Sequence, residues 1–257
     1  MDESALVATW LREEAQPFVG WDFSHIADRA IEPDPPWSYV AMARELLANA
    51  SSALDLGTGG GEVLASLHDA FPPRVVATEA YTPNVAVARE RLMPLGVTVV
   101  PYEADEATAP LPFEDGSFDA ILSRHEAYQP SEVARVLAPG GAFLTQQVDA
   151  SNLADLRSVF GVTTQWPQVT VDRFSEDLRA WGMVVAEAQH WRGSMTFKDV
   201  GAIVYWLKAI PWEVPGFSVH RHTKDLLELQ RRLDRDGGLV FAVGRFVIRA
   251  RKPATRT

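Results

Sequence analysis

The sequence predicts an α/β protein with a doubly wound, Rossmann-like sheet of seven strands, mostly parallel, whose last strand is antiparallel. Two observations support this fold class. Between residues 53 and 147, short apolar runs alternate with helical patterns, which is typical of βαβ units. A glycine-rich turn over residues 57–61 joins the first of these runs to a helical pattern.

Five apolar runs are expected to form the parallel core of the sheet. They span residues 53–57, 74–79, 97–103, 118–123 and 141–148. A crossover helix is expected over 82–92, because Thr82 is a good N-cap and Pro83 suits the first helical turn. A shorter helix is expected over 131–141, closed by Pro139 and two glycines.

The flanking segments are expected to cover and complete this sheet. Helices are predicted over residues 4–15, 38–50, 151–160, 172–182, 199–210 and 221–235, and strands over 183–191 and 239–252. Because no long linker interrupts the chain, we expect one domain over 1–257. Its parts are an N-terminal helical cover (1–50), a core (51–150) and a sheet-completing part (151–257), with an aromatic insertion (191–217) between the last two strands.

The composition of the chain disfavours several classes of partner and site. The 257 residues carry a net charge of -10 with six histidines and no cysteine. The negative charge disfavours a nucleic-acid partner, and no histidine pair has the HExxH spacing of a metal site, so no metal is expected. The acidic N-terminus and the lack of a long apolar run favour a cytoplasmic protein with no membrane partner. The oligomeric state is left open.

The glycine-rich turn is the sharpest local signal. Gly57, Gly59, Gly60 and Gly61 allow a ligand to approach the backbone closely, and the helix behind them offers free N–H groups. A dinucleotide fingerprint would need a glycine at position 62, where Glu62 would repel a pyrophosphate. A nicotinamide-dependent oxidoreductase is therefore disfavoured.

The pattern Asp-x-Gly-x-Gly-x-Gly from Asp55 resembles motif I of class I S-adenosylmethionine-dependent methyltransferases. The stretches EADEATAPLPFEDGSFDAILS (103–123) and EVARVLAPGGAFLTQQV (132–148) are similar to later motifs of that family. The resemblance implies S-adenosylmethionine as cofactor, with Glu79 on both ribose hydroxyls, Asp105 on the adenine amino group and Glu106 at the ring edge. The full set of predicted cofactor-binding residues is Asp55, Gly57, Thr58, Gly59, Gly61, Glu79, Ala80, Asp105, Glu106, Ser123 and Trp21.

The acceptor side is expected at the loop after the fourth strand, because ligands of open α/β sheets lie beyond the carboxyl ends of the strands. The candidate catalytic residues there are His125, Glu126 and Tyr128. His125 is either a general base or a wall of the pocket, and Glu126 or Tyr128 orients the substrate.

Aromatic residues in 18–26 and 191–217 either close an apolar pocket or pack these segments onto the core. The predicted function is methyl transfer to a small-molecule acceptor. The alternatives are an RNA or protein acceptor, or a non-catalytic protein that binds S-adenosylmethionine.

Overall fold

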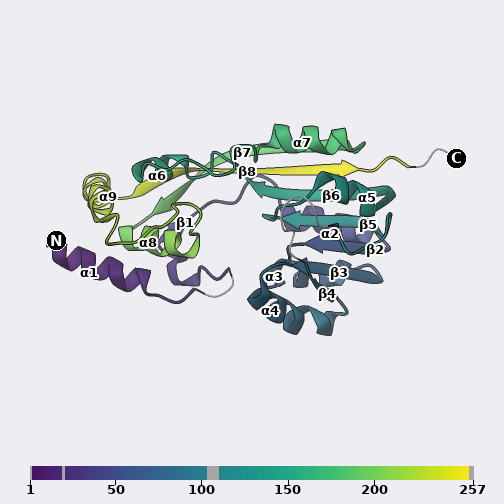
Figure 1. The fold of residues 1–257 in the computed structure, drawn as a ribbon, viewed down its shortest axis with the longest axis horizontal. Helices are drawn as coiled ribbons and strands as arrows, with labels where there is room; N and C mark the ends of the chain where they lie inside the picture. Colours follow the sequence, from purple (N-terminus) through teal and green to yellow (C-terminus); the bar gives the residue numbers. More distant parts are fainter. Residues whose placement is uncertain (1, 19–20, 103–109, 255–257) are drawn as a thin grey trace. The chain divides into compact units, whose positions relative to one another are not determined.

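The computed structural model describes residues 2–18, 21–102 and 110–254 (Figure 1). Contacts group the chain into two compact units, each built from several segments. Unit 1 comprises residues 1–35, 149–168 and 191–244, and unit 2 comprises 36–148, 169–190 and 245–257. Within the described ranges, none of the helices has both the length and the apolar character needed to span a bilayer. The expected single domain over 1–257 stays a prediction.

The helices and strands follow the alternation expected from the sequence. The α-helices are α1 (Glu3–Glu14), α2 (Tyr39–Ala48), α3 (Glu62–Ala65), α4 (Thr82–Leu92), α5 (Pro130–Val136), α6 (Ala154–Val159), α7 (Val171–Ala180), α8 (Val200–Ala209) and α9 (Thr223–Asp236). The 3-10 helices are η1 (Ser24–Ile26), η2 (His68–Ala70) and η3 (Met93–Leu95). The strands are β1 (Ala30–Ile31), β2 (Ser52–Leu56), β3 (Arg74–Glu79), β4 (Thr98–Pro101), β5 (Phe118–Arg124), β6 (Leu137–Val148), β7 (Val184–Phe197) and β8 (Leu239–Arg251).

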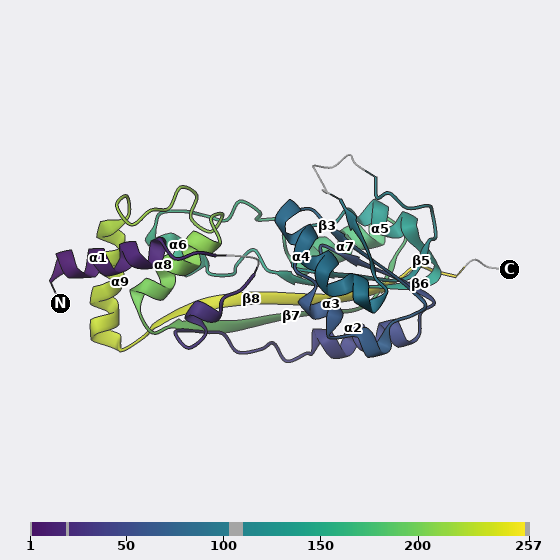
Figure 2. The same cartoon turned by 90° about the horizontal axis from the view of Figure 1, so that it is seen from below.

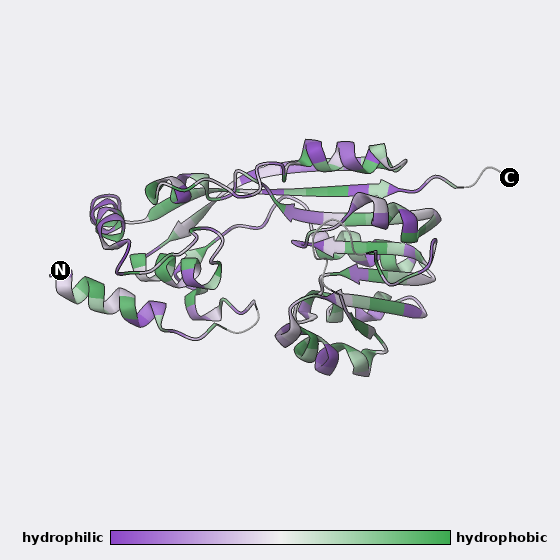
Figure 3. Cartoon of the chain, in the orientation of Figure 1, coloured by the Kyte–Doolittle hydropathy of each residue, from purple (hydrophilic) through white to green (hydrophobic). Residues whose placement is uncertain are grey.

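The sheet confirms the predicted fold class and adds one strand to the predicted seven. Its order is β1-β7-β8-β6-β5-β2-β3-β4. The five central strands from β6 to β4 are parallel neighbours, and β8 pairs antiparallel with β6, as expected of the last strand. The additional strand is β1, whose two residues pair antiparallel with the end of β7. The central strands are coloured mainly hydrophobic in Figure 3.

Helices cover both faces of the sheet in unit 2 because neighbouring strand residues alternate between the faces. Ala53 packs with the buried residues of α2, whereas Leu54 packs with those of α5 and α7. A further buried cluster joins α3 and α4 to β3 and β4. Figure 2 shows α2 and α5 on opposite faces of the sheet. This arrangement leaves the carboxyl ends of β2, β3 and β5 together at one edge.

The two largest differences between predicted and observed boundaries lie at the end of one helix and the end of one strand. The helix expected over 131–141 ends at Val136, and β6 begins at Leu137. Backbone geometry explains the change, because Pro139 cannot donate a hydrogen bond and Gly140 adopts a φ of +83°. The strand expected over 183–191 continues to Phe197, so the segment between the last two strands begins later than expected.

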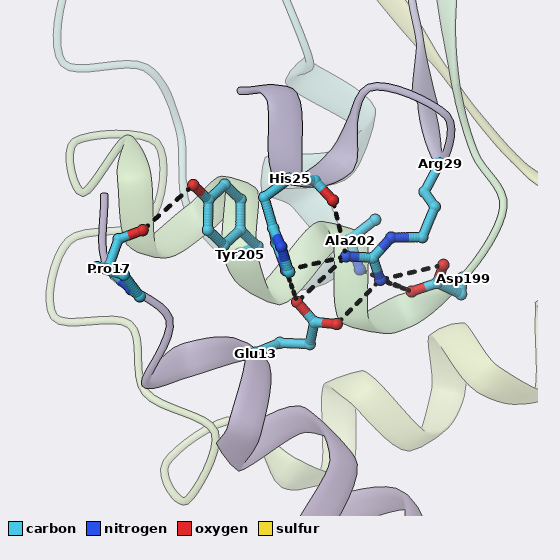
Figure 4. Close-up of polar contacts among 7 residues, drawn as sticks. All are labelled: Glu13, Pro17, His25, Arg29, Asp199, Ala202 and Tyr205. Atoms are coloured by element: carbon cyan, nitrogen blue, oxygen red, sulfur yellow. Dashed lines mark hydrogen bonds and ion pairs between the residues drawn. The ribbon is translucent and has the colours of Figure 1, made fainter. Parts of the chain in front are cut away.

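A charged network ties the N-terminal helix to α8 in unit 1 (Figure 4). Glu13 on α1 lies 2.8 Å from His25 Nε2 and accepts a hydrogen bond of 3.0 Å from Arg29. Arg29 also donates to Asp199, and Asp199 caps α8 by accepting from the Ala202 N–H at 2.8 Å. Burial alone would raise the pKa of Glu13, but hydrogen bonds from Arg29 and His25 outweigh it and lower that pKa.

Candidate functional site

The glycine turn connects β2 to α3 and is held against β3. Gly57, Gly59 and Gly61 have φ angles of +65°, +62° and +80°, which side chains other than glycine rarely tolerate. The Thr58 N–H donates to the Thr78 carbonyl at 2.8 Å, and the Gly57 N–H donates to the Thr78 hydroxyl at 3.3 Å. The turn thus has one fixed conformation at the carboxyl edge of the sheet.

Glu79 ends β3 beside this turn and is buried. One carboxylate oxygen accepts from the Gly59 N–H at 2.6 Å, and the other accepts from the Tyr81 N–H at 2.9 Å. Each oxygen keeps a further lone pair for a ligand hydroxyl. The acidic residue expected at this strand end from sequence spacing therefore does contact the glycine turn.

A small pocket lies behind the turn and carries both signs of charge. Its polar lining residues are Tyr39, Asp55, Thr58 and Arg124, which come from α2, the end of β2, the turn and the end of β5. Desolvation and the nearby charge of Glu79 raise the pKa of Asp55 to about 7. A carboxyl group and a guanidinium in one pocket complement the ammonium and carboxylate of an amino acid.

The loop after β5 brings Glu126 onto the glycine turn. A methyl group added at Gly57 would lie 2.2 Å from Glu126 Cγ, so the Glu126 side chain packs directly over that glycine. The buried Ser123 hydroxyl donates to the Glu126 carbonyl at 3.3 Å, and Gln147 Nε2 donates to it at 2.9 Å. Desolvation and the charge of Glu79 raise the pKa of the Glu126 carboxyl to about 7. This carboxyl group therefore changes charge near neutral pH.

His125 occupies the same loop in a left-handed backbone conformation, with φ of +60°. Its N–H donates to the Gln146 carbonyl on β6 at 2.8 Å, and its Nε2 lies 3.1 Å from Gln146 Nε2. Local desolvation and the charges of Arg124 and Arg245 lower its pKa well below the ordinary value.

Comparison with known proteins agrees with this geometry. Residues 53–141, from β2 to the start of β6, match the family model for a methyltransferase domain. This part of the chain is therefore similar in sequence to a methyltransferase domain. The fold of a candidate methyltransferase from Bacillus halodurans is similar, with a TM-score of 0.59 at 20% identity over 85% of this chain and all of that chain.

Two curated relatives are also methyltransferases. The demethylmenaquinone methyltransferase of Thermus thermophilus is 33% identical over 135 residues, which are 46% of this chain and 60% of that protein. The ubiquinone/menaquinone biosynthesis C-methyltransferase of Desulfotalea psychrophila is 31% identical over 116 residues, which are 42% of this chain and 46% of that protein. The chain thus spans about half of the length of the curated relatives that it matches.

The three predicted catalytic residues of the methyltransferase domain separate in the structure. Glu126 lies on the glycine turn, and His125 is held by β6. Tyr128 instead packs among aromatic side chains, with ring centroids 4.9 Å from Phe143 and 5.4 Å from Phe174. Burial raises the pKa of Tyr128. A role for Tyr128 in orienting the substrate stays a prediction.

The remaining predicted cofactor residues fall into three groups. Ala80 is exposed directly after Glu79. Asp105 and Glu106 lie outside the described residues. Trp21 belongs to unit 1, where its ring packs on Phe18 and Trp212, and its part in cofactor binding stays a prediction.

Sequence reasoning missed three polar residues that the structure adds to the site. Tyr39 lines the pocket from α2, while Gln146 and Gln147 hold the loop after β5 from β6. A signal for the two glutamines was present, because Thr145, Gln146 and Gln147 are consecutive polar residues in an otherwise apolar strand. Buried polar side chains in a strand need partners, and here the partners belong to the loop.

Proposed function

We propose that the protein transfers a methyl group from S-adenosylmethionine to a small-molecule acceptor. The observation that carries this proposal is the pocket behind the glycine turn, in which Asp55 and Arg124 both take part. S-Adenosylmethionine ends in an amino-acid group that such a pair can recognise. A dinucleotide would place a pyrophosphate at the glycine turn, where the carboxylate of Glu79, which accepts from the Gly59 N–H, would repel it.

The rest of the cofactor has suitable partners in the same domain. Glu79 retains lone pairs for the two ribose hydroxyls while it fixes the Gly59 and Tyr81 amides. Gly59 carries no side chain, so the cofactor can approach the backbone of the turn closely at this position. Adenine contacts by Asp105 and Glu106 belong to this proposal as expectations from the family resemblance.

The bound cofactor would supply an electrophilic methyl group on a positively charged sulfonium. The residues of the chain position the acceptor in line with that methyl group and exclude water from it. Glu126 and His125 occupy the loop that borders the turn, and we assign them to this acceptor side. Glu126 can bear a negative charge at neutral pH, which favours a cationic neighbour.

A small-molecule acceptor is supported by the relatives and by the charge of the chain. By their names, one curated relative methylates demethylmenaquinone and the other is a C-methyltransferase of ubiquinone and menaquinone biosynthesis. A net charge of -10 opposes the phosphate contacts that dominate nucleic-acid binding. A reduced naphthoquinone is therefore a reasonable first acceptor to test.

Calorimetry tests the cofactor. We expect S-adenosylmethionine and its demethylated product to bind, and NAD and NADP not to bind. Gly59→Val should abolish binding, because the branched side chain would fill the space of the cofactor and strain the turn. Gly96→Val is the matched control, since Gly96 also has a positive φ of +81° but no atom near the position of its added side chain.

A methyl-transfer assay tests the activity. Purified protein is incubated with radiolabelled methyl donor and 1,4-naphthoquinol, and the labelled product is extracted into organic solvent. Transfer that is lost in Gly59→Val but retained in Gly96→Val would support the proposal. Tight binding of NADP with no binding of S-adenosylmethionine would refute it.

A further inference from the structure

Three side chains in unit 2 form a hydrogen-bonded chain that ends at His125. The Trp37 indole N–H donates to Gln146 Oε1 at 2.8 Å, and Gln146 Nε2 lies 3.1 Å from His125 Nε2. An indole nitrogen can only donate, so the Gln146 oxygen must face Trp37 and its NH₂ group must face His125. Since an amide NH₂ also only donates, His125 Nε2 must accept.

This direction of hydrogen bonding fixes the state of the imidazole ring. A ring that accepts at Nε2 carries its hydrogen on Nδ1 and is neutral. The charged groups acting on the ring are Arg124 on β5 and Arg245 on β8, and both oppose a positive charge on it. Three independent partners therefore favour the neutral ring.

The backbone of the loop supports the same arrangement. The carbonyl of Gln146 accepts from the His125 N–H at 2.8 Å, so one residue holds both the main chain and the ring. Gln146 is itself 5% exposed, which limits alternative positions of its amide group. His125 has a φ of +60°, in the left-handed region that residues other than glycine adopt rarely. Strained residues of this kind are common at functional sites.

We propose that Trp37 and Gln146 are positioning residues that present His125 to the methyl acceptor as a neutral Nδ1–H donor. This inference rests on the proposed function. Among the described residues, His125 Nδ1 has no hydrogen-bond partner, and the residue is exposed. Its only lone pair is already used by Gln146, so His125 does not act as the general base. A fixed N–H donor suits an acceptor with a carbonyl or hydroxyl oxygen next to the methylated atom.

Nuclear magnetic resonance tests the state of the ring without any methyl transfer. Protein with ¹⁵N-labelled histidine is titrated from pH 5.5 to 8, and His125→Asn assigns the His125 signals. We expect the Nδ1–H tautomer of His125 over the whole range. A cationic ring at pH 7, or the Nε2–H tautomer, would overturn the inference even if methyl transfer were observed.

Two substitutions test the hydrogen bonds that link Trp37, Gln146 and His125. Gln146→Glu replaces the donating NH₂ by a carboxylate oxygen, so His125 should change to the Nε2–H tautomer and titrate at least one pH unit higher. Trp37→Phe frees the Gln146 amide to rotate and should give a mixture of tautomers. Trp181→Phe is the matched control, because Trp181 is exposed at the end of α7. The His125 signals of this variant should match those of the wild type. An unaltered tautomer in both test variants would refute the positioning role.

Steady-state kinetics distinguish a hydrogen-bond donor from a general base at position 125. His125→Asn keeps an N–H near the Nδ1 position and tolerates the left-handed backbone, whereas His125→Ala and His125→Gln do not place a donor there. We expect His125→Asn to retain kcat within about tenfold and the other two to lose about 100-fold or more. Equal losses in all three, with intact folding by circular dichroism, would contradict the donor role. Normal tautomers together with no methyl transfer would refute only the proposed function.

Discussion

Glu13 in unit 1 and Glu126 in unit 2 are the same residue type in opposite electrostatic surroundings. Glu13 lies between His25 and Arg29, and its pKa is lowered because their hydrogen bonds outweigh the effect of burial. Glu126 forms no ion pair with any other described residue, and desolvation together with the charge of Glu79 raises its pKa to about 7. Paired carboxylates hold a fold together, whereas an unpaired one near neutrality is available to a ligand.

The acidic groups at the strand ends also differ among themselves. Glu79 uses both oxygens on backbone amides, so its geometry is fixed before a ligand arrives. Glu126 has its backbone carbonyl fixed by Ser123 and Gln147, and its side chain rests on Gly57. If the cofactor is S-adenosylmethionine, Glu79 recognises its neutral ribose and Glu126 senses the charged sulfonium. Substitution of each glutamate should therefore produce a different pattern of losses.

The largest effect is expected for Glu79→Ala. Two charge-assisted hydrogen bonds to ribose contribute about 1.5 to 3 kcal/mol each, so cofactor affinity should fall at least about 100-fold. Because the donor and its demethylated product share the ribose, calorimetry should show equal losses for both. A loss confined to the methylated form would mean that Glu79 acts through its charge and not through the hydroxyls.

Glu126→Gln should have an intermediate effect that depends on both charge and pH. Two unit charges about 10 Å apart interact by about 1.7 kcal/mol at an effective dielectric constant of about 20, which corresponds to more than tenfold in affinity. At pH 8 the variant should bind S-adenosylmethionine about tenfold more weakly, while the neutral thioether product binds as before. Calorimetry with both ligands at pH 6 and pH 8 measures the difference.

The sign of the pH effect follows from the raised pKa of Glu126. Below about pH 7 the carboxyl group is protonated and neutral, and above it the group is ionised. The ratio of donor affinity to product affinity should therefore rise with pH in the wild type and stay flat in Glu126→Gln. Glu176→Gln, which removes an exposed charge from α7, should behave as the wild type. A flat wild-type ratio would remove Glu126 from sulfonium recognition.

Local signals predicted much of the fold. The strand over 74–79 and the helix over 82–92 appear with the expected bounds, and Pro83 lies in the first helical turn as expected, although the N-cap is Tyr81 and not Thr82. The boundary at Val136 was missed, since the residues before Pro139 suit a helix or a strand, and pairing with Phe118 decides for the strand. β1 was missed because two residues become a strand only through β7, far along the chain.

The sequence likewise predicted only part of the candidate site. Asp55 and Glu79 could be found from spacing, because the carboxyl ends of parallel strands must lie at one edge of the sheet. The contact between Trp37 and Gln146 joins positions 109 residues apart. No periodicity encodes such a contact, which depends on how the segment before α2 lies against β6. The sequence alone predicted that His125 lies in the loop after the fourth core strand. The tautomer of its ring could be inferred only from the structure.

The smallest effect is expected for Glu13→Gln, and it should concern stability alone. Replacing this carboxylate weakens partly exposed charge-assisted hydrogen bonds, at a cost of about 1 to 2 kcal/mol in the free energy of unfolding at pH 7. Since the folded pKa of Glu13 is lowered, its stabilisation is present above the unfolded pKa of about 4.3 and is lost as the pH falls through the folded value. Urea unfolding followed by tryptophan fluorescence should show a difference from the wild type at pH 7 that disappears near pH 3.

The control variant is Asp28→Asn, which changes an exposed acid of unit 1 and should show no such difference in stability. Cofactor affinity should stay within about twofold of the wild type in both variants, because the role of Glu13 is to hold α1 to α8. A tenfold loss of affinity in Glu13→Gln would show that this network belongs to the binding site.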